Sequence, residues 1–248
     1  MSDAGKKADL DAIARLQNMF APEPLHPDLV PYLRDTDHIG QMIHHKLVIS
    51  IMHSDAMNKM VNRRYEQTKA MVDEAYASAD WQRYVFLHER PYRFDALMEI
   101  MEPSGFWVID NPERANAFWR LVSSVWIDSE NIHENYNDWH EIWSSDPKPV
   151  AEAVMDEDDR ATFAALPEMV KVWRGATHKN VANGLSWTID KNKAEWFARR
   201  FSNPDRPSYI ASGRVTRNNI LAYFGGRNEK EVIIIPEHVM NVKVRRVK

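Results

Sequence analysis

Two glutamates, Glu229 and Glu231, stand one residue apart in the segment NEKEVIIIP. In an extended chain the side chains alternate between two faces, so these carboxylates would point to one side and Lys230 to the other. A pair of acids on one face can stabilise positive charge in a transition state or accept a proton from a nucleophile. A strand whose first residues are still in solvent would show the same pattern, so the pair alone does not establish a site.

Two other segments of strand-like sequence also carry polar side chains. Arg174 ends the segment VKVWR on the face of its two valines, and Gly175 follows it. In LSWTI, Ser186 and Thr188 share the face opposite to the apolar residues. The sequence therefore predicts that an arginine, a Ser-x-Thr pair and a Glu-x-Glu pair are each presented by a strand.

This order of elements resembles the Arg-Ser-Glu class of ADP-ribosyltransferases. The stretch VWRGATHKNVANGLSWTIDKNKAEWFARRF is similar to that family's first catalytic strand, its Ser-Thr-Ser strand and the helix that follows. As in the family's actin-modifying bacterial toxins, Asn183 lies three residues before the serine, Phe197 eleven after it and Arg200 fourteen after it. The likeness covers about residues 165–248. The sequence has Ser-Trp-Thr in place of Ser-Thr-Ser, which leaves the role of Thr188 open.

The resemblance implies cleavage of the nicotinamide–ribose bond of NAD+, which would be a substrate, without a metal. The ribose becomes oxocarbenium-like in the transition state, much as in glycoside hydrolysis, and Glu231 would stabilise it. Glu229 would orient or deprotonate the incoming acceptor. Arg174, beside Gly175, would hold the pyrophosphate or the nicotinamide side through its planar fork of donors.

The other members of the expected NAD+ site follow from the same resemblance. Ser186 would hold the catalytic glutamate or the nicotinamide ribose, next to Thr188 and Asn183. Phe197 would pack near the nicotinamide, and Arg200 would contact phosphate. Taken singly, each of these residues also fits an ordinary structural role, such as a strand-end arginine, a strand polar or a core phenylalanine. Their joint order and spacing favour the transferase.

The composition indicates a folded globular protein of 248 residues, 44% of them hydrophobic. No apolar run is long enough to cross a bilayer and the N-terminus lacks a signal peptide, so we expect a cytoplasmic protein without a membrane partner. The absence of cysteine excludes disulfides and thiolate chemistry. His133 and His140 lie seven residues apart, which is not the spacing of a zinc hydrolase, and we expect no metal site.

The charge is distributed unevenly along the chain. Residues 165–248 contain 16 Lys and Arg against 7 Asp and Glu, a net charge of +9, which leaves 16 against 29, or −13, for residues 1–164. Such asymmetry fits two complementary surfaces packed together. A basic lobe also suits an anionic ligand or nucleic acid.

Residues 1–164 show the spacing of amphipathic helices and residues 165–248 the short alternating runs of strands. Helices are expected at 9–20, 56–79, 80–89, 111–126 and 130–143, with their tryptophans in the core. Strands are expected at 170–174, 184–189, 209–215, 218–224, 231–235 and 240–247, interrupted by one helix that begins after an N-cap at Asp190. The strand-rich segment is small for an independent core, so we expect some helices to pack on it.

The expected fold is therefore α+β: a helical region, residues 1–164, packed on a mixed β-sheet catalytic core, residues 165–248. The resemblance implies the split β-sandwich of ADP-ribosyltransferases for this core. We expect the loop at residues 224–228 to help select the acceptor.

The Glu-x-Glu form resembles the arginine-modifying branch, so a protein arginine is the first acceptor we expect for mono-ADP-ribosylation. The basic lobe makes RNA or DNA the alternative acceptor. A toxin in bacterial or phage conflict, held by a neutralising antitoxin or chaperone, fits either acceptor. A binding protein that keeps the fold without catalysis is a second alternative.

If the acceptor is nucleic acid, arginines near the strand ends are the candidate phosphate contacts: Arg214, Arg217 and Arg227. The final strand carries further basic residues, which we expect to form a solvated face: Lys243, Arg245 and Arg246.

Overall fold

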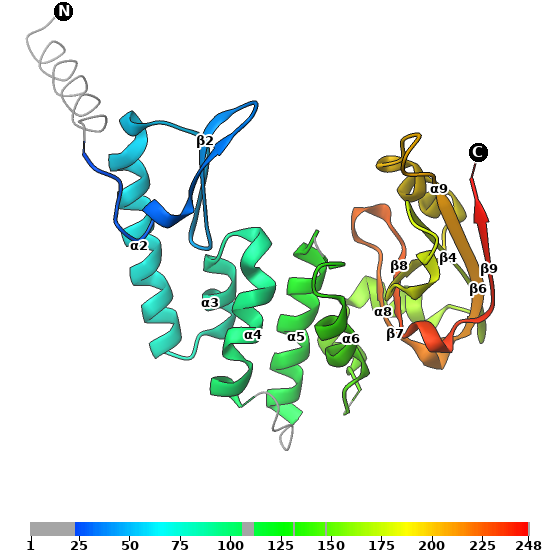
Figure 1. Ribbon diagram of the computed structural model, residues 1–248. Coiled ribbons are helices and arrows are strands. Elements are labelled where there is room, and N and C mark those ends of the chain that lie inside the picture. Colours follow the sequence, from blue (N-terminus) through cyan, green and yellow to red (C-terminus); the bar gives the residue numbers. More distant parts are fainter. Residues whose placement is uncertain (1–22, 106–111, 131, 147, 248) are drawn as a thin grey trace, which may run out of the picture. The chain divides into compact units, whose positions relative to one another are not determined.

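The computed structural model describes residues 23–105, 112–130, 132–146 and 148–247 (Figure 1). The chain divides into two compact units, residues 1–105 and 106–248. Each unit combines α-helices with an antiparallel sheet, so the predicted α+β class is confirmed. The helix expected at residues 9–20 lies outside the described residues.

The first unit contains a three-stranded antiparallel sheet with the order β1-β2-β3. The strands are β1 (Leu33–Thr36), β2 (Gly40–His45) and β3 (Val48–His53). The prediction that residues 1–164 are helical is therefore wrong for this segment. A glycine with φ of +78° begins β2 after the first turn, and the apolar run LVISI favours a strand because β-branched side chains pack well on a pleated surface.

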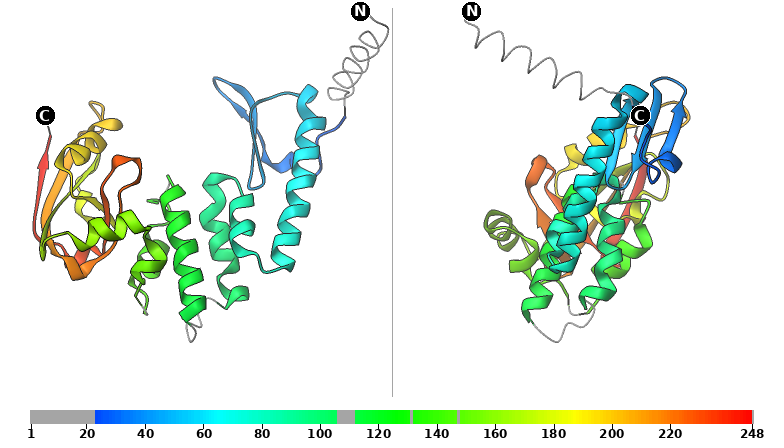
Figure 2. Two further views of the ribbon diagram at one scale, coloured as in Figure 1. Left: turned by 180° about the vertical axis from the view of Figure 1, so that it is seen from behind. Right: turned by 90° about the vertical axis from the view of Figure 1, so that its left-hand side faces the viewer.

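Three helices follow this sheet: α2 (Asn58–Ala77), α3 (Trp81–Leu87) and α4 (Arg93–Ser104). The helices expected at 56–79 and 80–89 are thereby confirmed. One face of α2 is buried at Val61, Tyr65 and Val72, the spacing of an amphipathic helix. The first half of α2 lies beside the sheet and its second half beside α3 (Figures 1 and 2).

The second unit begins with helices that bury a tryptophan cluster. These helices are α5 (Pro112–Asp128), α6 (Tyr136–Ser144), α7 (Ala151–Val154) and α8 (Glu157–Ala164). The rings of Trp119, Trp126, Trp139 and Trp143 are almost inaccessible and contact one another. Their predicted place in the core is confirmed.

The helix expected at residues 130–143 begins later than predicted, at Tyr136. Helix α5 instead continues to Asp128, and the Ser129 hydroxyl donates to the carbonyl of Val125 at 2.7 Å. This hydrogen bond satisfies one of the carbonyls left free at the helix end, so the serine closes α5 rather than opening the next helix.

The sheet of the second unit has six strands in the order β7-β8-β5-β4-β6-β9. They are β4 (Met169–Ala176), β5 (Ser186–Thr188), β6 (Tyr209–Thr216), β7 (Ile220–Phe224), β8 (Glu231–Ile234) and β9 (Met240–Arg246). All six expected strands are confirmed. Every pairing is antiparallel, so the expectation of a mixed sheet is wrong.

A single residue pair, Trp173 with Thr188, joins β4 to β5, whereas β4 pairs with β6 over its whole length. The sheet therefore consists of two three-stranded groups, β7-β8-β5 and β4-β6-β9. The expected helix, α9 (Lys191–Arg200), packs on β4, and the Asp190 side chain caps it by accepting from the backbone N–H of Asn192. A Cβ on Gly175 would collide with the backbone of α9 at Ala194, so only glycine permits this close packing.

The expected boundary at residue 164 lies between α8 and the first strand of the six-stranded sheet, but the compact units part at residue 105. Helices α5–α8 belong to the unit that contains the six-stranded sheet. Helix α8 contacts β7, and the side chain of Asp159 in α8 accepts from the backbone N–H of Gly225 at 2.8 Å. These helices supply the core that the strand-rich segment lacks by itself.

Candidate active site

Glu231 is the first residue of β8, and only 8% of its surface is exposed. Its Oε1 accepts a hydrogen bond from the indole Nε1 of Trp126 at 3.3 Å. Trp126 belongs to α5 and lies in the tryptophan cluster, so the packed helices aim this donor at the carboxylate. Sequence reasoning placed Trp126 in the core but gave no signal for the contact, because 105 residues separate the two partners.

Arg174 lies at the end of β4 with its guanidinium turned toward β5. Its Nη1 donates to the backbone carbonyl of Ser186, and the guanidinium lies so close to Gly184 that a Cβ there would overlap it. Burial lowers the pKa of Arg174, and the neighbouring Glu231 carboxylate acts in the opposite direction by favouring the charged form. The structure thus brings Arg174 close to Glu231 and to the backbone carbonyl of Ser186, whereas the role expected of the Ser186 side chain stays a prediction.

One donor of Arg174 is left over in this arrangement. Its Nε is buried and has no hydrogen-bond partner among the described residues. A buried guanidinium donor without an acceptor is costly, so native structures seldom leave one unless a ligand or water completes it. A ligand oxygen, such as that of a phosphate or a carboxamide, suits this position.

Thr188, whose role the sequence left open, holds two neighbouring segments in place. Its hydroxyl donates to the backbone carbonyl of Glu229 at 2.7 Å and accepts from the backbone N–H of Asp190 at 3.0 Å. The side chain is buried. Thr188 therefore ties the start of α9 to the chain just before β8, and it positions both.

Glu229 does not lie in the strand. Its backbone is helical, with φ −90° and ψ −22°, at the end of the short turn Gly226–Asn228, and Lys230 has a positive φ of 48°. The expected alternation that puts both glutamates on one strand face is therefore wrong. The reason is tertiary: the Lys230 side chain binds Asp190 at 3.2 Å and its carbonyl accepts from the backbone N–H of Ile189, which holds the turn away from extended geometry.

Asn183 is exposed at the end of the short turn Val181–Asn183, directly before Gly184. It therefore flanks the contact between the guanidinium of Arg174 and the main chain. Phe197 and Arg200 make their described contacts elsewhere: Phe197 touches the ring of Trp196, and the Arg200 guanidinium stacks over Trp196 and Phe201. These contacts are with residues of α9 and its C-cap rather than with Arg174 or Glu231, so the role of both side chains toward NAD+ stays a prediction.

Two residues that the sequence did not single out also lie within electrostatic reach of Arg174. Burial raises the pKa of Tyr136, at the start of α6, and the charge of Glu237 acts in the same direction. Burial also lowers the pKa of His178, with Arg174 as a second cause, so this imidazole is favoured in its neutral form. Helix α6 and the loop after β4 thus border the Arg174 side of the site.

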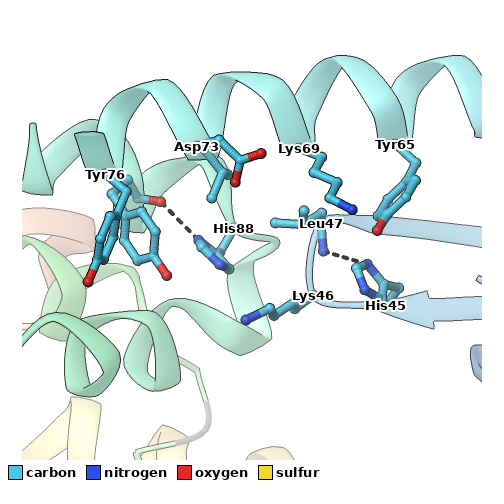
Figure 3. Close-up of a pocket in the computed structure, with 10 residues that line it drawn as sticks. His45, Lys46, Leu47, Tyr65, Lys69, Asp73, Tyr76 and His88 are labelled. Atoms are coloured by element: carbon cyan, nitrogen blue, oxygen red, sulfur yellow. Dashed lines mark hydrogen bonds between the residues drawn. The ribbon is translucent and has the colours of Figure 1, made fainter. Parts of the chain in front are cut away.

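A separate pocket of about 350 Å³ lies in the first unit, between α2 and the turn that joins β2 to β3 (Figure 3). Tyrosine, lysine and histidine side chains line it, among them Tyr65, Tyr76, Lys69, His45 and His88. The Nδ1 of His88 lies 2.9 Å from a backbone carbonyl and must donate to it. Burial lowers the pKa of both histidines, which favours neutral rings.

Neither a membrane-spanning helix nor a metal site accompanies the candidate active site and this pocket within the described residues. No helix within the described part of the chain is long and apolar enough to cross a membrane. Over the same residues, no group of three or more His, Asp or Glu side chains is placed to hold a metal ion. Comparisons of the chain with protein-family models, curated proteins and solved structures found no match.

Proposed function

We propose that the protein is an NAD+-dependent mono-ADP-ribosyltransferase in which Glu231 is the catalytic carboxylate. The observation that carries this proposal is the meeting of three elements: the buried Glu231 of β8, the buried guanidinium of Arg174 in β4, and the backbone of β5 at Ser186, whose carbonyl accepts from Arg174. These are the three residue types, in chain order, of the Arg-Ser-Glu class. The division of the sheet into two three-stranded groups supports the split β-sandwich of that class.

The reaction breaks the bond between the ribose C1 and the nicotinamide nitrogen, and nicotinamide leaves with the bonding electrons. A nucleophile then forms a bond to C1 and loses its proton. Glu231 accepts a hydrogen bond from a ribose hydroxyl and stabilises the oxocarbenium-like ribose. A charge-assisted hydrogen bond of this kind contributes about 1.5–3 kcal/mol before any additional transition-state effect.

The neighbours of Glu231 prepare it for this task. The Trp126 indole fixes the orientation of one carboxylate oxygen, so that the carboxylate need not reorganise during the reaction. Arg174 is held by the Ser186 carbonyl and keeps its Nε available for a phosphate or carboxamide oxygen. Glu229, in the turn held by Thr188, is proposed to orient or deprotonate the acceptor, with a protein arginine as the first candidate.

Release of nicotinamide from NAD+ tests the proposal directly. In the full chain, Glu231→Ala should lower the rate by about 10²–10³-fold or more, the loss that follows removal of an electrostatic stabiliser. Glu168→Ala, which removes an exposed carboxylate away from the site, is the matched control and should keep the wild-type rate. Wild-type turnover in Glu231→Ala, or no turnover in the wild type, would sink the proposal in favour of a binding protein.

Labelled NAD+ incubated with the protein and cell extract then identifies the acceptor. Label that is removed by protease and resists nuclease supports a protein acceptor. Label that survives protease and is lost with nuclease assigns the acceptor to RNA or DNA. Free arginine should act as a poor substitute acceptor only in the first case.

A further inference from the structure

Two large aromatic side chains are exposed at the C-terminal end of α9, and each contacts the guanidinium of Arg200. Trp196 is 52% exposed and Phe201 is 66% exposed. The guanidinium of Arg200 lies over both rings, at 5.1 Å and 4.9 Å from their centroids. Aromatic rings of this size are normally buried, so two exposed rings bridged by an arginine mark a surface suited to a planar partner.

Basic and polar side chains line a pocket that begins at the same end of α9. A shallow pocket of about 520 Å³ between the end of α9 and the edge strand β9 is lined by Arg199 and Arg246, together with Ser202, Asn203 and Ser208. Arg206 is also exposed, in the loop that joins α9 to β6. We name this set the α9-end surface: Trp196, Arg199, Arg200, Phe201, Arg206 and Arg246.

The charge of this surface is only partly balanced by the protein itself. Arg245 binds Glu195 at 3.1 Å, and Asp205 is an exposed acid of the same region. Within the described ranges, no carboxylate forms an ion pair with the guanidinium of Arg199 or Arg246. These two arginines are therefore available to an anionic partner.

The exposed rings and the available guanidiniums together indicate the chemical class of the partner that this surface would bind. We propose that the α9-end surface binds single-stranded nucleic acid. Unpaired bases stack on exposed aromatic rings, while the neighbouring guanidiniums bind phosphates. A duplex hides its base faces, and an acidic peptide would use the charges without the rings.

This assignment moves the phosphate contacts away from the residues that the sequence suggested. The guanidinium of Arg217 donates to the carbonyls of Ala164 and Leu166, both at 2.9 Å, so it holds the chain between α8 and β4. The side chain of Arg227 lies outside the described residues. Lys243, Arg245 and Arg246 are exposed, as expected for a solvated face, and Arg246 also lines the pocket beside α9.

Fluorescence anisotropy with a labelled oligouridylate of about 12 nucleotides, in the absence of NAD+, tests this proposal. Because NAD+ is absent, the outcome does not depend on the proposed transferase activity. The wild-type protein should bind with a Kd below about 100 μM at low salt, and oligothymidylate serves to distinguish RNA from DNA.

Two sets of variants distinguish the contribution of base stacking to binding from the contribution of charge. Phe201→Ala and Trp196→Ala should each weaken binding by about fivefold or more, whereas Tyr76→Ala, an exposed ring of the first unit, should not. Changing Arg199 and Arg246 to glutamate should weaken binding and reduce the salt slope by about 1.4, because two phosphate contacts are lost. Arg63→Glu, an exposed arginine of α2, is the charge control.

Several results would overturn the proposal. They are a wild-type Kd above about 100 μM, tighter binding of duplex than of single strands, and equal competition by polyglutamate. Unchanged binding in both Phe201→Ala and Trp196→Ala would equally overturn it. Circular dichroism of each variant shows that the fold is intact, and the two aromatic positions provide independent tests.

Discussion

The two compact units handle buried polar groups in different ways. In the first, burial favours the neutral form of His88, whose Nδ1 donates to the carbonyl of Tyr84 at 2.9 Å while its Nε2 has no described partner. In the second, the oppositely charged Arg174 and Glu231 lie close together in the interior, and Arg174 Nε has no described partner.

This difference distinguishes buried groups that serve function from buried groups that affect only the stability of the fold. Buried charges that are incompletely hydrogen-bonded cost stability, so a fold retains them where they serve binding or catalysis. The buried histidine rings of the first unit are favoured in their neutral form, so they cost less to bury than charges even where a ring nitrogen has no described partner. We therefore expect changes at Arg174, Glu231 and their neighbours to alter activity, and changes around His88 to alter stability alone.

The largest effect after the loss of Glu231 itself is expected at Glu229. Glu229→Gln should lower transfer to the acceptor by about 100-fold or more, because a general base contributes about 10²–10⁴-fold. Nicotinamide release into water should fall much less, since water is a less demanding nucleophile. Both rates are measured on the same protein, with Glu168→Gln as the control. Equal losses in both rates would contradict the assigned role.

Arg174→Lys keeps the positive charge but loses the planar fork of donors. NAD+ affinity should fall by about tenfold or more, since a hydrogen bond to a charged group contributes about 1.5–3 kcal/mol. Isothermal titration calorimetry measures this affinity, and thermal melting checks that the fold survives. Unchanged affinity would return Arg174 to a purely structural role and remove the contrast between the two units.

Trp126→Phe removes the N–H donor to Glu231 but keeps an aromatic ring in the cluster. We expect kcat for nicotinamide release to fall about tenfold while KM for NAD+ changes little, because the donor orients the catalytic carboxylate. Trp119→Phe is the matched control, since its indole N–H has no described partner in the same cluster. Equal kinetic effects in both variants would show that packing, rather than the hydrogen bond, matters.

The smallest effect is expected in the first unit. Burial lowers the pKa of His88, with Lys46 acting in the same direction and Glu99 and Asp95 opposing it, so the unfolded chain binds more protons than the folded one below about pH 6.5. Stability should therefore fall as the pH drops from 7.5 to 5.5, by no more than about 1–2 kcal/mol.

His88→Gln should weaken this pH dependence without changing nicotinamide release, because glutamine stays neutral over the whole range. The His88→Gln change should not abolish the pH dependence of stability, since burial also lowers the pKa of His45. Thermal melting at several pH values measures the effect, with the exposed His38→Gln as the control. A pH dependence identical to that of the wild type would mean that other groups cause it.

Much of the second unit could be predicted from the sequence because its signals are local. Runs of valine and isoleucine predict the six strands, and Asp190 predicts the start of α9. The hydrophobic spacing of α5 places its tryptophans in the core. The first unit was harder, because the short strands at residues 33–53 carry few alternating positions and lie among strong helical patterns.

The amino-acid sequence by itself thus determined the elements of the sheet and the order of Arg174, Ser186 and Glu231 along them. Only the tertiary structure decided that Trp126 donates to Glu231, that Glu229 leaves the strand, and that α5–α8 complete the core of the sheet. The physical reason is the range of the forces involved. The hydrophobic periodicity of a segment indicates which of its side chains face the core and which face solvent. A hydrogen bond between residues 105 positions apart depends instead on how whole layers pack against one another.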